Sequence, residues 1–126
     1  MTYPEVLGTK LRVAGFACLG TVAADRLAYA LSQIVALVGM STGGMAPKIW
    51  AYPLPGGQGG DGVTAVQPLV ESLLAIDTWP ALSHRGKPVP KVYVLLASCK
   101  PFSLDAVAAY LSKEIGPVVR QGFFEL

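Results

Sequence analysis

Apolar and polar residues follow a helical rhythm over the segment Val22–Val38. The apolar positions there recur every three or four residues, and the polar ones fall largely on the opposite side of the helix. Thr21 is a suitable N-cap residue, and Gly39, followed by Gly43 and Gly44, favours an end to the helix. The pattern predicts an amphipathic helix over Val22–Val38.

A second helix is predicted over Leu104–Ile115. Ser103 can cap its first turn, and Asp105 places a negative charge near the positive end of the helix dipole. Gly116 and Pro117 then stop the helix.

Short apolar runs elsewhere in the chain predict strands. These runs are Lys10–Leu19, Ile49–Tyr52, Val63–Val70, Ser72–Ile76, Val92–Ala97 and Val118–Phe124. Pro68 favours an edge position or a bulge, and the unbroken apolar run Val92–Ala97 predicts a strand buried on both faces. The order β-α-β-β-β-β-α-β predicts one α+β domain over residues 1–126, a two-layer sandwich of a mostly antiparallel sheet with two helices on one face.

Two segments predict loops. The stretch Pro53–Gly62 is rich in glycine, but a strand pattern follows it and it lacks the Lys-Ser/Thr of a P-loop, which disfavours a nucleotide site. The stretch Leu82–Pro90 is polar and contains the single histidine, His84, which we expect to be solvated.

Composition limits the classes of function. The chain is 52% hydrophobic and only 14% charged, which predicts a surface covered partly by another copy or by a second protein. The net charge of +2 is small and disfavours nucleic acid as a partner. The apolar segment Val22–Met40 contains Asp25 and Arg26, so a membrane span is not expected. No signal-peptide pattern opens the sequence, so we expect a cytoplasmic protein. The small share of charged residues leads us to expect a homo-oligomer.

The cysteines and histidine are too few for a disulfide framework or a structural zinc site, so no metal is expected. Cys18 is expected to be a core residue. Cys99 follows the predicted strand Val92–Ala97 by two residues, and we interpret it as a candidate catalytic residue for the reason given below.

The ten residues ESLLAIDTWP, from Glu71 to Pro80, carry the main candidate chemistry. They resemble the bacterial-type, pyruvoyl-dependent S-adenosylmethionine decarboxylases, which combine a Glu-Ser cleavage site, a short apolar strand and a His-Thr-Trp-Pro-Glu motif. A later strand in that family ends on a catalytic cysteine, which is similar to Val92–Cys99. Upstream, VAGFAC and IWAYPLPGG are also similar, so the resemblance spans roughly residues 8–115.

The resemblance implies a self-processing lyase of polyamine (spermidine) biosynthesis. The Ser72 hydroxyl would attack the Glu71 carbonyl to form an ester, and elimination and hydrolysis would leave a pyruvoyl group that acts as an electron sink during decarboxylation. Cys99 would then return a proton, since a thiol with a pKa of about 8.5 can release one near neutral pH. Trp50, Tyr52 and Trp79 would contact the small-molecule substrate, although Trp79 could instead be a core anchor.

Three departures from the family pattern weaken parts of this assignment. Asp77 replaces the processing histidine, Ala81 replaces the glutamate that binds ribose, and Ala14 replaces an acidic residue of the first strand. A carboxylate is a weaker base than imidazole near neutral pH, so we expect slow cleavage, a largely uncleaved protein, and faster cleavage in Asp77→His. We also expect Ser72, Asp77 and Cys99 to meet at one end of neighbouring strands.

Two alternatives stay open. The chain could be an uncleaved, non-decarboxylating relative that binds an adenosyl or amino-acid ligand, or a structural module without a site. Without the ribose-binding glutamate, the substrate of a decarboxylase could be S-adenosylmethionine or a simpler amino acid.

Overall fold

The computed structural model describes residues 10–52, 62–79, 83–84, 87–88 and 92–126. The main strands are β1 (Arg12–Cys18), β2 (Lys48–Tyr52), β3 (Gly62–Leu69), β4 (Ser72–Thr78), β7 (Val92–Ser98) and β8 (Val118–Glu125). The helices are α2 (Leu27–Leu37) and α3 (Leu104–Glu114), with a 3-10 turn, η1 (Ala24–Arg26), before α2. A small hairpin is formed by β5 (Ser83–His84) and β6 (Lys87–Pro88).

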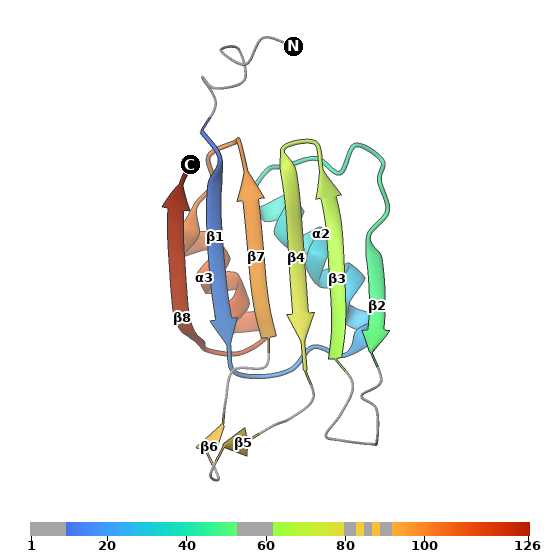
Figure 1. Ribbon diagram of the computed structural model, residues 1–126, viewed down its shortest axis with the longest axis vertical. Coiled ribbons are helices and arrows are strands. Elements are labelled where there is room, and N and C mark those ends of the chain that lie inside the picture. Colours follow the sequence, from blue (N-terminus) through green and yellow to red (C-terminus); the bar gives the residue numbers. More distant parts are fainter. Residues whose placement is uncertain (1–9, 53–61, 80–82, 85–86, 89–91) are drawn as a thin grey trace.

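The six main strands form one antiparallel sheet in the order β2-β3-β4-β7-β1-β8. Both helices lie on the same face of this sheet, and the described residues form no second layer on the other face (Figure 1). The predicted α+β two-layer arrangement is confirmed.

The core lies between the sheet and the helices. Alternate residues of the central strands point toward the helices, and their side chains pack against α2 and α3. The fully buried members with the largest side chains include Leu27, Leu31 and Ile34 of α2 and Leu74, Ile76 and Leu96 of the sheet. Apolar residues recur every second position in the strands and about every 3.6 positions in the helices, so their side chains meet in one core.

Helix α2 is shorter than predicted at its N-terminal end. Ala23 is extended (φ −64°, ψ 145°), the 3-10 turn follows, and Arg26, not Thr21, occupies the N-cap position without a side-chain cap. Its C-terminal end agrees with the prediction. Gly39 adopts a left-handed φ of +67°, and the Met40 N–H donates to the Val35 carbonyl oxygen at 3.1 Å.

Helix α3 begins where the sequence predicts. The Ser103 Oγ accepts a hydrogen bond from the Ala106 N–H at 3.1 Å, which satisfies one of the otherwise unpaired donors of the first turn. Beyond the helix, the chain passes very close to the end of β1, where Gly116 lies against the Leu19 carbonyl group.

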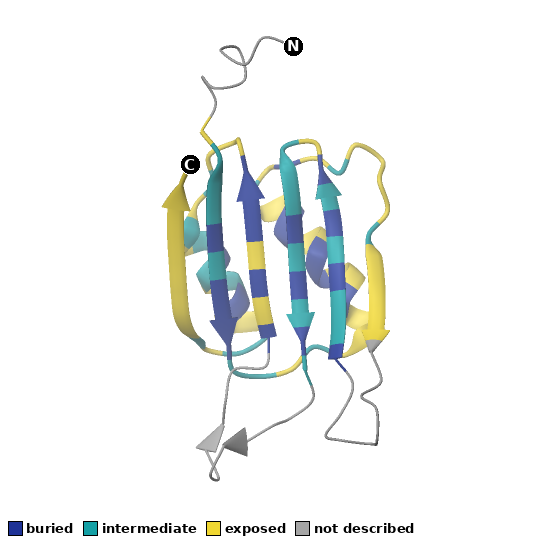
Figure 2. Cartoon of the chain, viewed as in Figure 1, coloured by how far each residue is buried: buried dark blue, intermediate teal, exposed yellow. Residues whose placement is uncertain are grey.

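The prediction that the Val92–Ala97 strand is buried on both faces is wrong. Along β7, Val92, Val94 and Leu96 are buried, whereas Tyr93 and Leu95 are 44% and 42% exposed (Figure 2). The helices cover only one face of the sheet, so the alternate side chains of this central strand face outward. We call this uncovered side the open face.

The two predicted loops differ in how much of them is described. Of the glycine-rich stretch only Gly62, the first residue of β3, belongs to the described residues. The polar loop contains the short β5–β6 hairpin, which the sequence pattern did not predict. Pro68 lies on β3 beyond the residues that pair with β2, so its missing N–H is not needed on that side.

Candidate functional site

The Glu71–Ser72 peptide lies in the tight hairpin between β3 and β4. Leu69 and Ser72 are register partners, so Val70 and Glu71 form the turn. Ser72 has a φ of 154°, and among the described residues it is the one non-glycine residue with a positive φ. This sparsely populated backbone conformation indicates local strain at the predicted cleavage site.

Three backbone or side-chain hydrogen bonds hold this turn. The Glu71 carbonyl oxygen accepts from the Cys99 N–H at 3.1 Å, and the Glu71 carboxylate accepts from the Ser41 N–H at 2.9 Å. The Val70 N–H in turn donates to the Ser41 carbonyl oxygen at 2.9 Å. The Cys99 N–H therefore polarises the carbonyl group that Ser72 would attack, as an oxyanion donor does.

The sheet register brings Cys99 to this turn from a distant part of the chain. Ser72 pairs with Ser98, whose position one residue before Cys99 places the cysteine beside the turn. Cys99 is exposed, and its carbonyl oxygen accepts from the Arg12 Nη1 at 3.2 Å. Cys18, by contrast, is buried in the core as predicted, and burial raises the pKa of its thiol to about 11.

The expectation that Asp77 shares a site with Ser72 and Cys99 is wrong. Asp77 comes five residues after Ser72 on the same strand, a separation of about 16 Å at a rise of about 3.3 Å per residue. An odd number of residues also puts the two side chains on opposite faces of the sheet. Asp77 lies on the open face, where its two oxygens accept from Thr64 Oγ1 at 2.8 Å and Trp79 Nε1 at 3.1 Å.

The candidate aromatic residues lie at the Asp77 end, away from Ser72. Trp50 and Thr64 are register partners, as are Thr64 and Asp77, so Trp50 belongs to the same row across the sheet. The Lys48 ammonium lies 5.2 Å from the centroid of the Trp50 ring. Trp79 covers Gly62, where an added Cβ would come within 2.5 Å of its ring. The side chain of Tyr52, and all of Ala81, lie outside the part of the chain described.

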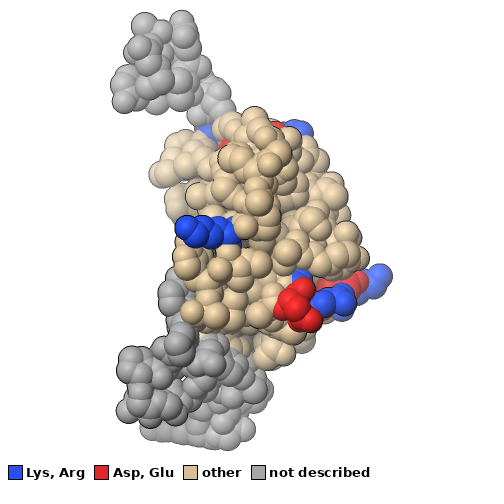
Figure 3. Space-filling model, turned by 90° about the vertical axis from the view of Figure 1, so that its right-hand side faces the viewer, with Lys and Arg blue, Asp and Glu red and all other residues tan. Residues whose placement is uncertain are grey.

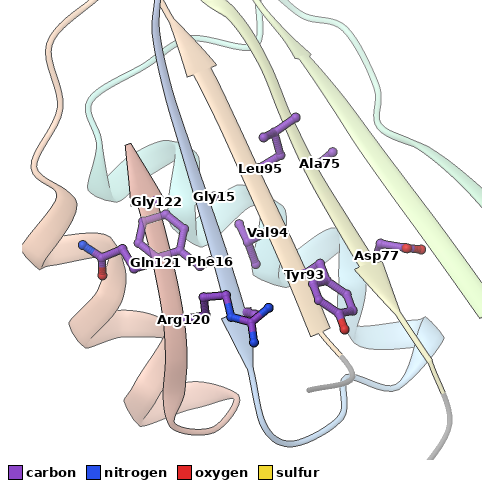
Figure 4. A pocket seen from close by; sticks show the side chains of 11 residues that line it. Gly15, Phe16, Ala75, Asp77, Tyr93, Val94, Leu95, Arg120, Gln121 and Gly122 are labelled. Atoms are coloured by element: carbon purple, nitrogen blue, oxygen red, sulfur yellow. The ribbon is translucent and has the colours of Figure 1, made fainter. Parts of the chain in front are cut away.

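Sequence reasoning missed a depression on the open face with a volume of about 550 Å³. Its floor includes Gly15 and Gly122, and Tyr93, Leu95 and Arg120 are among the residues that line it. Figure 4 shows Arg120, Tyr93 and Asp77 along one end of this region, with Leu95 and Ala75 farther along their strands. The available signal was a glycine within each of two predicted strands, because such glycines often mark close approach of another group.

The side of the molecule that carries β2 shows few charged side chains, most of them gathered toward one end (Figure 3). Within the described ranges, no group of three or more His, Cys, Asp or Glu residues is placed to hold a metal ion. In the same part of the chain, no helix has the length and apolar character needed to cross a membrane.

Comparison of the chain with protein-family models, curated proteins and solved structures gave no match. The resemblance to the S-adenosylmethionine decarboxylases therefore stays a prediction from the sequence motifs.

Proposed function

We propose that the chain is an S-adenosylmethionine decarboxylase-like lyase that generates a pyruvoyl group from Ser72. The observation that carries this proposal is the geometry of the Glu71–Ser72 peptide, where a strained Ser72 follows a carbonyl group polarised by the Cys99 N–H. Both features favour attack on the Glu71 carbonyl carbon, because strain raises the energy of the amide and the donor stabilises the oxyanion.

The residues of the turn have distinct roles in this proposal. The Ser72 hydroxyl is the nucleophile, and within the described residues its Oγ has no hydrogen-bond partner that would have to be displaced. The Glu71 carboxylate, bonded to the Ser41 N–H, fixes the turn from the other side. After processing, a pyruvoyl ketone would supply the electron sink for loss of carbon dioxide, and the Cys99 thiol would deliver a proton.

Slow processing follows from the position of Asp77. A base about 16 Å away cannot accept the Ser72 proton directly, since general-base catalysis requires hydrogen-bond reach or one bridging water. The same observation favours the second candidate function, an uncleaved relative that binds an adenosyl or amino-acid ligand without decarboxylation.

Intact-mass analysis of the purified full-length chain tests the proposal. We expect a mostly intact protein that slowly yields fragments of residues 1–71 and 72–126, and faster cleavage at the same bond in hydroxylamine, which traps the ester. Ser72→Ala should abolish both, whereas Ser98→Ala, at the paired strand position, should leave hydroxylamine cleavage in place. Carbon dioxide release from S-adenosylmethionine or amino acids should track the processed fraction.

The absence of any Ser72-dependent fragment, with and without hydroxylamine, would contradict self-processing. Binding of an adenosyl compound or amino acid by that uncleaved protein would then support the second candidate function.

A further inference from the structure

Two glycines lie side by side on neighbouring strands, one of which, β8, is an edge strand of the sheet. Gly15 of β1 and Gly122 of β8 are register partners, and neither has a positive φ. A Cβ added at either position would meet no heavy atom within 4 Å. Neither backbone conformation nor packing within the described chain therefore requires glycine, although glycine within a strand lowers stability. What the pair provides is open space above the sheet.

The space above the glycines is bounded by larger side chains. Tyr93 and Leu95 of the neighbouring strand β7 stand beside it on the open face, and both are exposed by more than 40%. Arg120 precedes Gly122 by two residues and therefore stands on the same face of β8. A flat backbone floor with an apolar wall accommodates the face of a ring, and a volume of about 550 Å³ suits a small molecule.

Arg120 defines the charge of the occupant. Within the described ranges it has no carboxylate partner, since Lys10 and Arg12 make the two ion pairs, both with Glu125. A guanidinium group binds a carboxylate through two parallel hydrogen bonds. Asp77 lies in the same row of residues, about 14 Å from Arg120 across three strand spacings, and its charge disfavours a polyanion.

We propose that this depression binds an aromatic carboxylate with a single negative charge. The ring lies on Gly15 and Gly122 against Tyr93 and Leu95, and the carboxylate pairs with Arg120. The site is separate from the Glu71–Ser72 turn and does not depend on cleavage there, so it goes beyond the function proposed above.

A titration of the full chain with 2-naphthoate, followed by backbone amide NMR, tests the site. We expect saturable shifts at Gly15, Arg120 and Gly122. The neutral analogue 2-naphthamide keeps the ring without the charge, and acetate keeps the charge without the ring. Both should bind at least about tenfold more weakly, because each lacks one of the two interactions.

Variants separate the two parts of the site. Arg120→Met should weaken 2-naphthoate binding about tenfold or more and bring it close to that of 2-naphthamide. Arg26→Met is the matched control, since Arg26 lies over the Tyr29 ring next to α2 and should not affect binding. Gly15→Leu should fill the space and abolish binding, with Gly122→Leu as a second filling variant if the first fails to fold.

Several results would overturn the proposal. Equal binding of 2-naphthoate and 2-naphthamide would show that Arg120 does not bind the carboxylate. Unchanged binding of 2-naphthoate to a folded Gly15→Leu or Gly122→Leu protein would show that the ring does not lie on the glycines. If 2-naphthoate does not bind and a filling variant instead lowers the molecular mass in solution, the space receives a second copy of the chain.

Discussion

At the scale of single residues, Asp77 is the residue whose position in the structure differs most from the one expected from the sequence. Its carboxylate joins a strand residue, Thr64, to Trp79 on the open face, far from Ser72. We therefore no longer expect Asp77→His to accelerate cleavage, because an imidazole at position 77 remains about 16 Å from the Ser72 hydroxyl. Intact-mass time courses of Asp77→His and the unaltered chain should coincide, and faster cleavage in the variant would contradict this geometry.

The same carboxylate has a structural role that Asp77→Asn tests. An asparagine has one acceptor oxygen in place of two and no charge, so Thr64 and Trp79 would have to share that oxygen, or the Thr64 hydroxyl would have to turn and accept from the amide. We expect the free energy of unfolding to fall by about 1 kcal/mol, measured by urea denaturation. Thr64→Val, which replaces the donating hydroxyl with a methyl group of similar size, provides the comparison, and a smaller loss for Asp77→Asn than for this variant would argue against the shared role.

The two cysteines should differ sharply in reactivity. Cys99 is exposed beside the Glu71–Ser72 turn, whereas burial raises the pKa of the Cys18 thiol to about 11 and disfavours the reactive thiolate. Iodoacetamide at pH 8 should label one site per folded chain, at Cys99, as located by peptide mass analysis. Cys99→Ser should then show almost no labelling, while denatured protein should be labelled at Cys18 too.

At the scale of elements, the close crossing of two connections limits what the sequence can tolerate. Gly116, after α3, lies so near the end of β1 that a Cβ would overlap the Leu19 carbonyl oxygen. Both groups belong to the backbone, so neither can rotate away. We expect Gly116→Ala to lower the free energy of unfolding by about 3 kcal/mol in urea denaturation. Gly15→Ala, which meets open space, should change it by less than about 1 kcal/mol.

Local sequence signals predicted most of the elements because the signals are themselves local. Ser103 caps α3 through a bond to Ala106 three residues away, and Gly39 ends α2 through its own backbone conformation. The start of α2 was misplaced because Ala23 is extended despite its high helix propensity. The continuous apolar run of β7 was misleading, since Tyr93 and Leu95 are apolar without being covered.

The part of the candidate site that the sequence predicted correctly is the approach of Cys99 to the Glu71–Ser72 turn. Register places Ser98 opposite Ser72 and so brings Cys99 to the turn, as expected. The predicted strand Ser72–Ile76 already separates Ser72 from Asp77 by its own length, so the shared site was expected from the motif resemblance and not from the strand geometry. Arg120 and the two glycines belong to strands that are distant in the sequence, so only their pairing reveals the depression.

At the scale of the whole molecule, the described residues leave the open face of the sheet uncovered. The helices cover one face of the sheet, while large apolar side chains on the other face stay exposed, among them Leu95 and Phe124. Leu73, Ala97, Val13 and Phe124 occupy successive strands in register, and we call them the apolar row. Exposed apolar surface of this kind is typical of protein contact sites, which supports the proposal of a homo-oligomer.

We propose that a second copy packs against the apolar row and leaves the Arg120 end of the open face accessible. Phe124 is 54% exposed, so Phe124→Lys should leave the fold intact yet place a charge in the contact, where burying it without a partner is unfavourable. Light scattering at micromolar concentration should report a multiple of the chain mass for the unaltered protein and the single-chain mass for Phe124→Lys. Leu37→Lys, the same kind of change on α2 at a position 44% exposed, should keep the oligomer. A monomeric unaltered protein would contradict the proposal, and loss of the oligomer only in Leu37→Lys would move the contact to the helical layer.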